Sequence, residues 1–311
     1  GMEPSDLPFD NQYLHQANGE TKLLIRHGHE YDAANFGVDV RKWLVIPTLI
    51  DKSFYDRPSF GDIVTSEIAA KLPILFKDHY TEKAILEDPA LSLLFQRLID
   101  FDNVRPSNAL INFLFSTPGL SMKKVWCLIE PVFVKMLDDL SFAPEIGRQM
   151  IAFGGMAGFS ATSLRAVLKT RLWRRGLPFW MIKSLLAPVS RRSKIGDQSA
   201  IIQREELLQT ENSPVRCIVS GHTHNPLVQL MKMEKGIETY YINSGTFRNV
   251  ITATPNLRDF GRLRSKARVL IFKHGERNPE YDRETGWSFD FTTRFGFGAP
   301  PPEQQDLAQF D

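Results

Sequence analysis

Two short apolar segments of this chain each lead into a loop that carries a glycine and two histidines separated by one residue. The run 23–25 leads into His27-Gly28-His29, and the run 215–220 leads into Gly221-His222-Thr223-His224. Short apolar runs bounded by glycine predict buried β-strands. Glycine lets the backbone turn sharply after a strand, so the imidazoles of each loop can converge. The sequence therefore predicts two histidine-bearing loops, each directly after a β-strand.

Neutral imidazole is the commonest metal ligand in proteins, and two imidazoles two residues apart can reach the same ion or neighbouring ions. Two such pairs, each behind a strand, predict a metal site where the loops meet. The alternative is that these histidines cap loops or make local hydrogen bonds.

The rest of the chain separates into a helical zone and a strand-rich zone. Apolar residues at spacings of three and four predict helices over Thr65–Phe76, Ala90–Asp100, Met122–Leu140 and Ser163–Trp173. Short β-type runs predict strands at Val215–Ser220, Leu227–Met231, Thr239–Asn243, Ala267–Phe272 and Trp287–Phe291. Gly236, after Glu234 and Lys235, is typical of a hairpin turn.

These patterns predict an α/β fold whose core is discontinuous in sequence. Residues 1–39 and 200–295 would form the core, because either flank alone is too small for a good one. Residues 40–199 would form a helical insertion or cap. Residues 296–311, with three consecutive prolines, would form a flexible tail.

Composition excludes several other classes of protein. Hydrophobic residues make up 42% and charged residues 24%, as in an ordinary globular protein rather than a disordered chain or a coiled coil. No stretch reaches the roughly 20 apolar residues of a membrane-spanning helix. The two cysteines, Cys127 and Cys217, lie in apolar runs without metal-ligand spacing, which predicts buried reduced thiols. We therefore expect a cytoplasmic protein, with or without peripheral contact to a membrane.

The positive charge is concentrated in the helical zone. The chain carries 38 Lys and Arg against 36 Asp and Glu, yet residues 146–196 contain no acidic residue. The basic residues of that window are Arg148, Arg165, Lys169, Arg171, Arg174, Arg175, Lys183, Arg191, Arg192 and Lys194. Tryptophan and phenylalanine are interleaved over 165–194, which suits an anionic membrane surface. The alternatives are a solvated basic face, a grip on an anionic substrate, or nucleic acid, which we do not expect because no nucleic-acid module is visible.

The two histidine loops resemble motifs of a known enzyme family. The segments 220–226 and 241–247, with sequences SGHTHNP and YINSGTF, resemble the last motif region of calcineurin-like metallophosphoesterases, and His27-Gly28-His29 resembles the motif before it. A helical insertion between these motifs is similar to the UDP-diacylglucosamine hydrolase branch, in which an inserted lid handles lipid chains. The resemblance covers roughly the first 40 residues and residues 200–275.

The resemblance implies a two-sheet α/β/β/α sandwich that hydrolyses a phosphomonoester or phosphodiester by metal-activated water. The cofactors would be divalent ions, namely Mn, Fe, Zn or Mg. By position in the motifs, His27 and His222 would bind one metal and His224 the other.

The same comparison implies a set of supporting residues. His29, with Asp32 or Asn35, would lie around the metal ligands, and Asn243 would stand at the strand-end turn. Arg248, just after that turn, could contact a substrate phosphate. No residue is assigned as the catalytic acid or base.

Three family motifs that should precede His27 are missing, namely Asp-x-His, Gly-Asp and Gly-Asn-His. Two divalent cations a few ångströms apart repel strongly, and a bridging carboxylate normally offsets that repulsion. Three neutral imidazoles cannot do so, so we expect one ion at most, or none. The chain would then be a truncated or degenerate family member, unless unfamiliar residues replace the missing ligands.

Two other functions remain open from sequence. The run from Leu23 to Gly28 also resembles the strand–Arg-His-Gly motif of histidine phosphatases, in which His27 would be the phosphorylated nucleophile and Arg26 would clamp phosphate. The other is a pseudoenzyme or membrane-surface binding protein that kept the scaffold without the chemistry.

Overall fold

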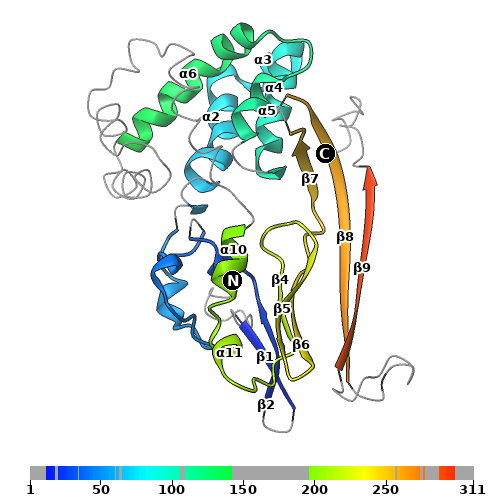
Figure 1. Cartoon of the computed structure of the whole chain (residues 1–311). Coiled ribbons are helices and arrows are strands. Elements are labelled where there is room, and N and C mark those ends of the chain that lie inside the picture. Colours follow the sequence, from blue (N-terminus) through cyan, green and yellow to red (C-terminus); the bar gives the residue numbers. More distant parts are fainter. Residues whose placement is uncertain are drawn as a thin grey trace, which may run out of the picture. The chain divides into compact units, whose positions relative to one another are not determined.

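A computed structural model describes residues 12–17, 20–33, 35–59, 61–62, 65–105, 109–141, 196–255, 258–273, 276 and 287–297 (Figure 1). This part of the chain is mixed α/β, as the sequence predicts. The chain divides into two compact units. The first comprises 1–57, 195–248 and 264–296, and the second comprises 58–194, 249–263 and 297–311.

This division differs from the boundaries expected from sequence at residues 40–57, 196–199 and 249–263. Residues 40–57 belong to the first unit rather than to the helical insertion, because Val40, Ile46 and Ile50 are buried in its core. Residues 249–263 belong to the second unit. Local periodicity marks helices and strands but does not show which core an element joins.

A five-stranded sheet organises the first unit. Its strand order is β1 (Gln12–Ala17), β2 (Glu20–Arg26), β4 (Cys217–Ser220), β6 (Ile237–Asn243) and β5 (Leu227–Glu234). The three central strands are parallel to one another, while β1 runs antiparallel to β2 and β5 antiparallel to β6. The carboxyl ends of β2, β4 and β6 therefore meet at one edge, where both histidine loops begin.

Sequence patterns anticipated four of these strands. β2, β4, β5 and β6 are confirmed, and Glu234 pairs with Ile237 across the predicted hairpin turn. β1 was not anticipated, because Gln12–Ala17 is largely polar and Tyr13 is 55% exposed. β1 pairs along one edge of β2 and β4 along the other.

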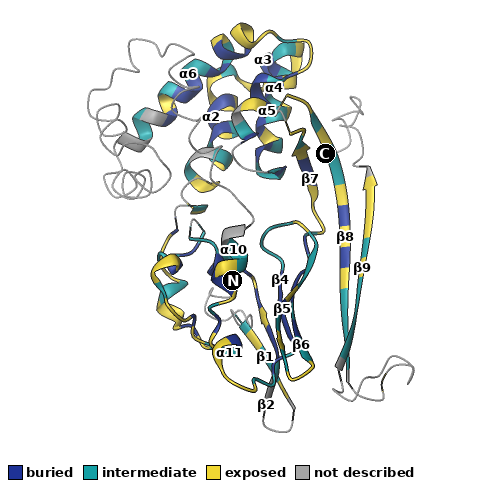
Figure 2. Ribbon diagram, in the orientation of Figure 1, coloured by how far each residue is buried: buried dark blue, intermediate teal, exposed yellow. Residues whose placement is uncertain are grey.

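Buried residues occur along the strands of this sheet (Figure 2). They fall into two separate clusters. Leu24, Ile218 and Tyr241 face a core completed by α10 (Gly196–Ile202) and α11 (Glu206–Gln209), which contribute Ile201, Ile202 and Leu208. Leu23, Cys217, Val219 and Ile242 face the other way, against Val269, Ile271, Phe289 and Phe291 of β8 (Phe260–Lys273) and β9 (Trp287–Phe297). Full burial of each such aliphatic side chain stabilises the fold by about 1.5–3 kcal/mol.

Short 3₁₀ helices connect β2 to the second unit. They are η2 (His29–Tyr31), η3 (Val40–Lys42) and η4 (Lys52–Phe54). Asp39 and Asp51 cap the last two, each accepting a hydrogen bond from a backbone amide two residues later. These turns carry the chain around the histidine loop.

The second unit is a helical cluster. Its helical elements are η5 (Thr65–Ala70), α2 (Lys71–Tyr80), α3 (Glu82–Glu87), α4 (Pro89–Ile99), η6 (Asp100–Asn103), α5 (Leu110–Phe115) and α6 (Met122–Ser141). The three predicted helices that the structure describes are confirmed, with η5 and α2 together spanning the first. The predicted helix Ser163–Trp173 and the basic segment 165–194 lie outside the described residues.

A second sheet has the strand order β3 (Val104–Arg105), β7 (Asn249–Ala253), β8 and β9. β3 and β7 are parallel and belong to the second unit, whereas β8 begins there and continues into the first. The predicted strands at 267–272 and 287–291 are confirmed and are longer than expected. Of the predicted tail, 298–311 lies outside the described residues.

One prediction about the cysteines is wrong. Cys217 is buried, but Cys127 is exposed, and both thiols are free. Cys127 lies on α6, where Val125, Ile129 and Val132 form the buried stripe at helical spacing, so its own position faces solvent. Among the helices that the structure describes, none is both long enough and apolar enough to cross a membrane.

Candidate functional site

The two histidine loops meet at the carboxyl edge of the parallel strands. Ile25 of β2 pairs with Val219 of β4, and beyond this register the Gly221 amide donates a hydrogen bond to the His27 carbonyl at 3.0 Å. The rings of His27 and His222 then lie with their centroids 5.3 Å apart. Strand pairing, rather than the loop sequences alone, therefore brings these imidazoles together.

Glycine at position 28 permits this close approach. Gly28 adopts φ 103°, and a Cβ there would lie 2.8 Å from Ser220 Cβ and 3.1 Å from His222 Cβ. Any larger residue would suffer backbone strain and a steric clash with the second loop.

Three imidazoles and one carboxylate make up the resulting cluster. His29 Nδ1 lies 3.0 Å from His27 Nδ1, and the His29 and His222 ring centroids are 6.3 Å apart. Asp32 Oδ2 lies 3.2 Å from His222 Nε2 and accepts a hydrogen bond of 2.7 Å from Asn35 Nδ2. The structure thus gathers five of the residues that the sequence assigned to the site.

The surroundings of His27 favour its neutral form. Burial lowers the pKa of His27, and the neighbouring imidazoles of His29 and His222 lower it further. A neutral ring keeps a lone pair on nitrogen, which is the form that coordinates a metal.

A buried carboxylate that the sequence did not single out supports the first loop. Glu30 is fully buried, and its side chain accepts hydrogen bonds from the Gly28 amide at 2.7 Å and from the Tyr55 hydroxyl at 3.1 Å. Its Oε2 also lies 3.4 Å from His29 Nδ1. Through these contacts Glu30 fixes the conformation of the first loop. The only sign of this role in the sequence is an acidic residue directly after the histidine pair.

A second unanticipated carboxylate lies in the core beneath β2. Glu205 Oε1 accepts a 2.5 Å hydrogen bond from the buried guanidinium of Arg26, which also donates to the carbonyls of Pro47 and Thr48. Burial raises the pKa of Glu205 to about 7, while the charge of Arg26 opposes the rise. Arg26 is therefore committed to the core.

Asn243 ties the ends of β4 and β6 together. Its Nδ2 donates to Ser220 Oγ at 3.3 Å and to the Tyr241 hydroxyl at 3.1 Å, and its Oδ1 accepts from the Gly245 amide at 3.0 Å. The Asn243 side chain is buried. Its amide thus holds the strand ends from which the His222 loop departs.

His224 and Arg248 occupy the outer parts of their loops. His224 is partly exposed and adopts φ 60°, a left-handed conformation that is uncommon for a residue with a side chain. Arg248 is exposed, and its amide donates to Thr246 Oγ1 at 3.2 Å. Their roles as second-metal ligand and phosphate contact stay predictions.

The side chains of this cluster are not arranged as a metal-binding group in the described structure. Within the described ranges, no group of three or more His, Cys, Asp or Glu side chains is already arranged around a common point as in a metal site. The imidazoles instead contact one another, and Asp32 is the carboxylate beside them. The Glu30 side chain already accepts hydrogen bonds from Gly28 and Tyr55, so its oxygens are used within the first loop.

A scan of the chain against protein-family models found no match, and searches of curated proteins and of solved structures found none either. The resemblance to metallophosphoesterases therefore rests on the histidine motifs alone.

Proposed function

We propose that this protein is a metal-dependent phosphoesterase that holds one divalent cation between its two histidine loops. The observation that carries the proposal is the 5.3 Å separation of the His27 and His222 rings at the carboxyl ends of adjacent parallel strands. Ligands bind at this edge in open α/β sheets, because side chains from several strands converge there. The implied two-sheet sandwich, with β8 and β9 against the five-stranded sheet, is part of the same proposal.

Each residue of the cluster has a separate task in this proposal. His27 and His222 supply neutral nitrogens, while Asp32 orients His222 or joins it as a ligand, steadied by Asn35. His29 Nδ1 lies 3.0 Å from His27 Nδ1 and 3.4 Å from Glu30 Oε2, so in this proposal His29 is a positioning residue for the His27 ring. When bound, the cation supplies Lewis-acid activation of water and of a phosphoryl oxygen.

The histidine-phosphatase alternative is disfavoured by the position of Arg26. That mechanism needs the arginine to clamp phosphate beside the nucleophilic histidine. Arg26 is only 2% exposed and is bound to Glu205 and to two backbone carbonyls, so it does not present its guanidinium to a ligand at His27.

Metal titration of the stripped protein, together with hydrolysis of p-nitrophenyl phosphate and its bis-ester, tests the proposal. We expect close to one Mn²⁺ or Zn²⁺ per chain and hydrolysis that EDTA abolishes. The variants His27→Ala and His222→Ala should lose both properties. His79→Ala, which removes an exposed histidine on α2, is the matched control and should lose neither.

Three outcomes would contradict the proposal in different ways. Metal binding without hydrolysis of either ester would identify a binding protein. Hydrolysis that persists in EDTA and labels His27 with phosphate would identify a histidine phosphatase. Failure to bind either metal would remove the basis for both the cofactor and the reaction.

A further inference from the structure

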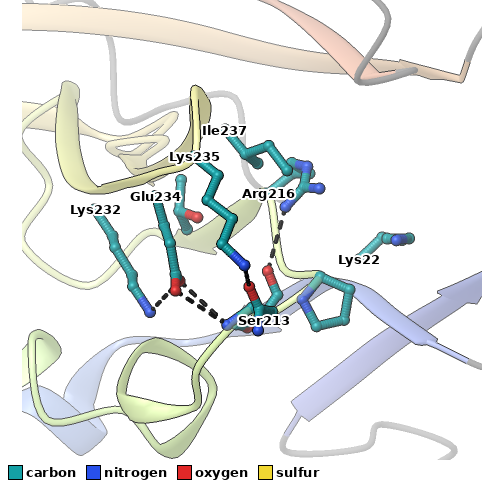
Figure 3. A pocket seen from close by; sticks show the side chains of 10 residues that line it. Lys22, Ser213, Arg216, Lys232, Glu234, Lys235 and Ile237 are labelled. Carbon is teal, nitrogen blue, oxygen red and sulfur yellow. Dashed lines mark hydrogen bonds and ion pairs between the residues drawn. The ribbon is translucent and has the colours of Figure 1, made fainter.

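A second charged pocket lies at the opposite end of the same parallel strands (Figure 3). Lys22 stands near the start of β2, and Arg216 directly precedes β4, whereas the histidine loops follow the ends of these strands. From Lys22 to His27, the strand rises by roughly 16 Å. The pocket and the histidine cluster are therefore separate sites on one sheet.

Basic side chains from three segments surround this pocket. Lys22 and Arg216 line one side of it, and the β5–β6 hairpin contributes Lys232, Glu234 and Lys235 (Figure 3). The residues that line the pocket thus include four cations and one carboxylate, and Lys232 is paired with that carboxylate at 2.9 Å and donates to the Thr210 carbonyl at 3.1 Å. Like charges gathered around one concavity repel one another, and a bound anion relieves that repulsion.

The carboxylate of the pocket, Glu234, is engaged by an ion pair and by hydrogen bonds. Glu234 pairs with Lys232 at 2.9 Å and accepts the Asn212 amide with both oxygens, each at 3.2 Å. Lys235 donates to Asn212 Oδ1 at 2.6 Å. The Arg216 guanidinium is held in turn by the carbonyls of Ser213, at 3.4 Å, and Val215, at 3.1 Å.

The backbone of this region is held in place by the same contacts. Asn212 adopts φ 54°, and the turn pair Lys235 and Gly236 has φ 51° and 78°, which matches a two-residue type I′ hairpin turn. The loop before β4 is therefore fixed against the hairpin, and the cations are positioned before any ligand arrives.

We infer that this pocket binds the phosphate or diphosphate group of an anionic ligand. Its volume of about 140 Å³ has room for roughly ten water-sized groups, enough for a diphosphate. Phosphate oxygens match the chemistry of the pocket, because lysine and arginine donors form strong charge-assisted hydrogen bonds with them. The inference does not depend on hydrolysis at the histidine loops.

Calorimetric titration with inorganic pyrophosphate at about 0.15 M ionic strength tests the inference. A sedimentation assay with vesicles containing phosphatidic acid asks whether the phosphate is instead presented by a lipid. Lys22→Gln and Lys232→Gln should each weaken binding about tenfold or more, because each removes a charge-assisted donor. Glu234→Gln removes the opposing charge but keeps an acceptor oxygen, so it should strengthen binding.

The control is Lys52→Gln, which neutralises an exposed lysine on η4 in the same unit and should bind as the parent does. Binding to pyrophosphate alone supports a soluble ligand, and binding to vesicles alone supports a lipid phosphate. The inference is overturned if neither binds, or if Lys52→Gln weakens binding as much as the two pocket variants. In the metal-stripped protein, His222→Ala should leave pyrophosphate binding unchanged, so failure of the phosphoesterase proposal would be distinguishable.

Discussion

Substitution of Gly28 by alanine tests the claim that the two histidine loops are held in contact. An alanine at φ 103° carries backbone strain of about 1–2 kcal/mol. Its Cβ would also lie 2.8 Å from Ser220 Cβ, and such overpacking typically costs about 1–3 kcal/mol. We therefore expect Gly28→Ala to lower the free energy of unfolding by about 2–5 kcal/mol, a large share of a typical total.

Gly236→Ala provides a matched control for the strain component. Gly236 belongs to the same unit and has φ 78°, but a Cβ there would meet no atom within 4 Å. Gly236→Ala should therefore lower the free energy of unfolding by only about 1–2 kcal/mol. The difference between the two variants isolates the contact between the loops.

Urea unfolding followed by circular dichroism gives the free energies, and a Mn²⁺ titration of the same samples reports on the cluster. If the loops separate to relieve the clash, stability recovers but metal affinity falls. The reasoning is refuted if Gly28→Ala matches Gly236→Ala in both stability and metal affinity.

Two further predictions concern groups outside the histidine cluster. Because burial raises the pKa of Glu205 from 4.5 to about 7, the folded state holds its proton more tightly, and stability should fall as pH rises through that window. Urea midpoints between these pH values should show that fall, and Glu205→Gln should flatten it; an unchanged slope would assign the pH dependence to other groups. Asp88→Ala should lower the unfolding free energy by about 1 kcal/mol, because Asp88 Oδ1 caps α4 by accepting the Ala90 amide at 2.7 Å. Asp56→Ala, at an exposed position in a turn, is the control for urea unfolding, and equal effects of the two variants would contradict the capping role.

The structure also changes the argument about missing carboxylates. The sequence lacks the metal-bridging aspartate of the family that its histidine motifs resemble, and Asp32 is the carboxylate that the fold brings beside His222. One carboxylate and neutral imidazoles can balance part of the charge of one divalent cation, but they leave two neighbouring cations strongly repelled. A stoichiometry near one ion per chain is therefore the physical expectation for this site.

Several features of this protein could be predicted from local sequence. The strands β2, β4, β5 and β6 and the helices α4 and α6 follow from hydrophobic periodicity, which reports the burial of one face of an element. The position of each histidine pair directly after a strand can likewise be predicted from neighbouring residues. These signals are strong because the residues that create them are neighbours in the chain.

Other features depend on contacts between distant parts of the chain. The pairing of β2 with β4 decides that His27 meets His222, and it joins segments nearly two hundred residues apart. The burial of Arg26 against Glu205, and the engagement of Glu30 by Tyr55, are likewise non-local. A polar residue looks the same in sequence whether it faces solvent or a partner in the core, so only the packed structure decides which charges build the site and which support it.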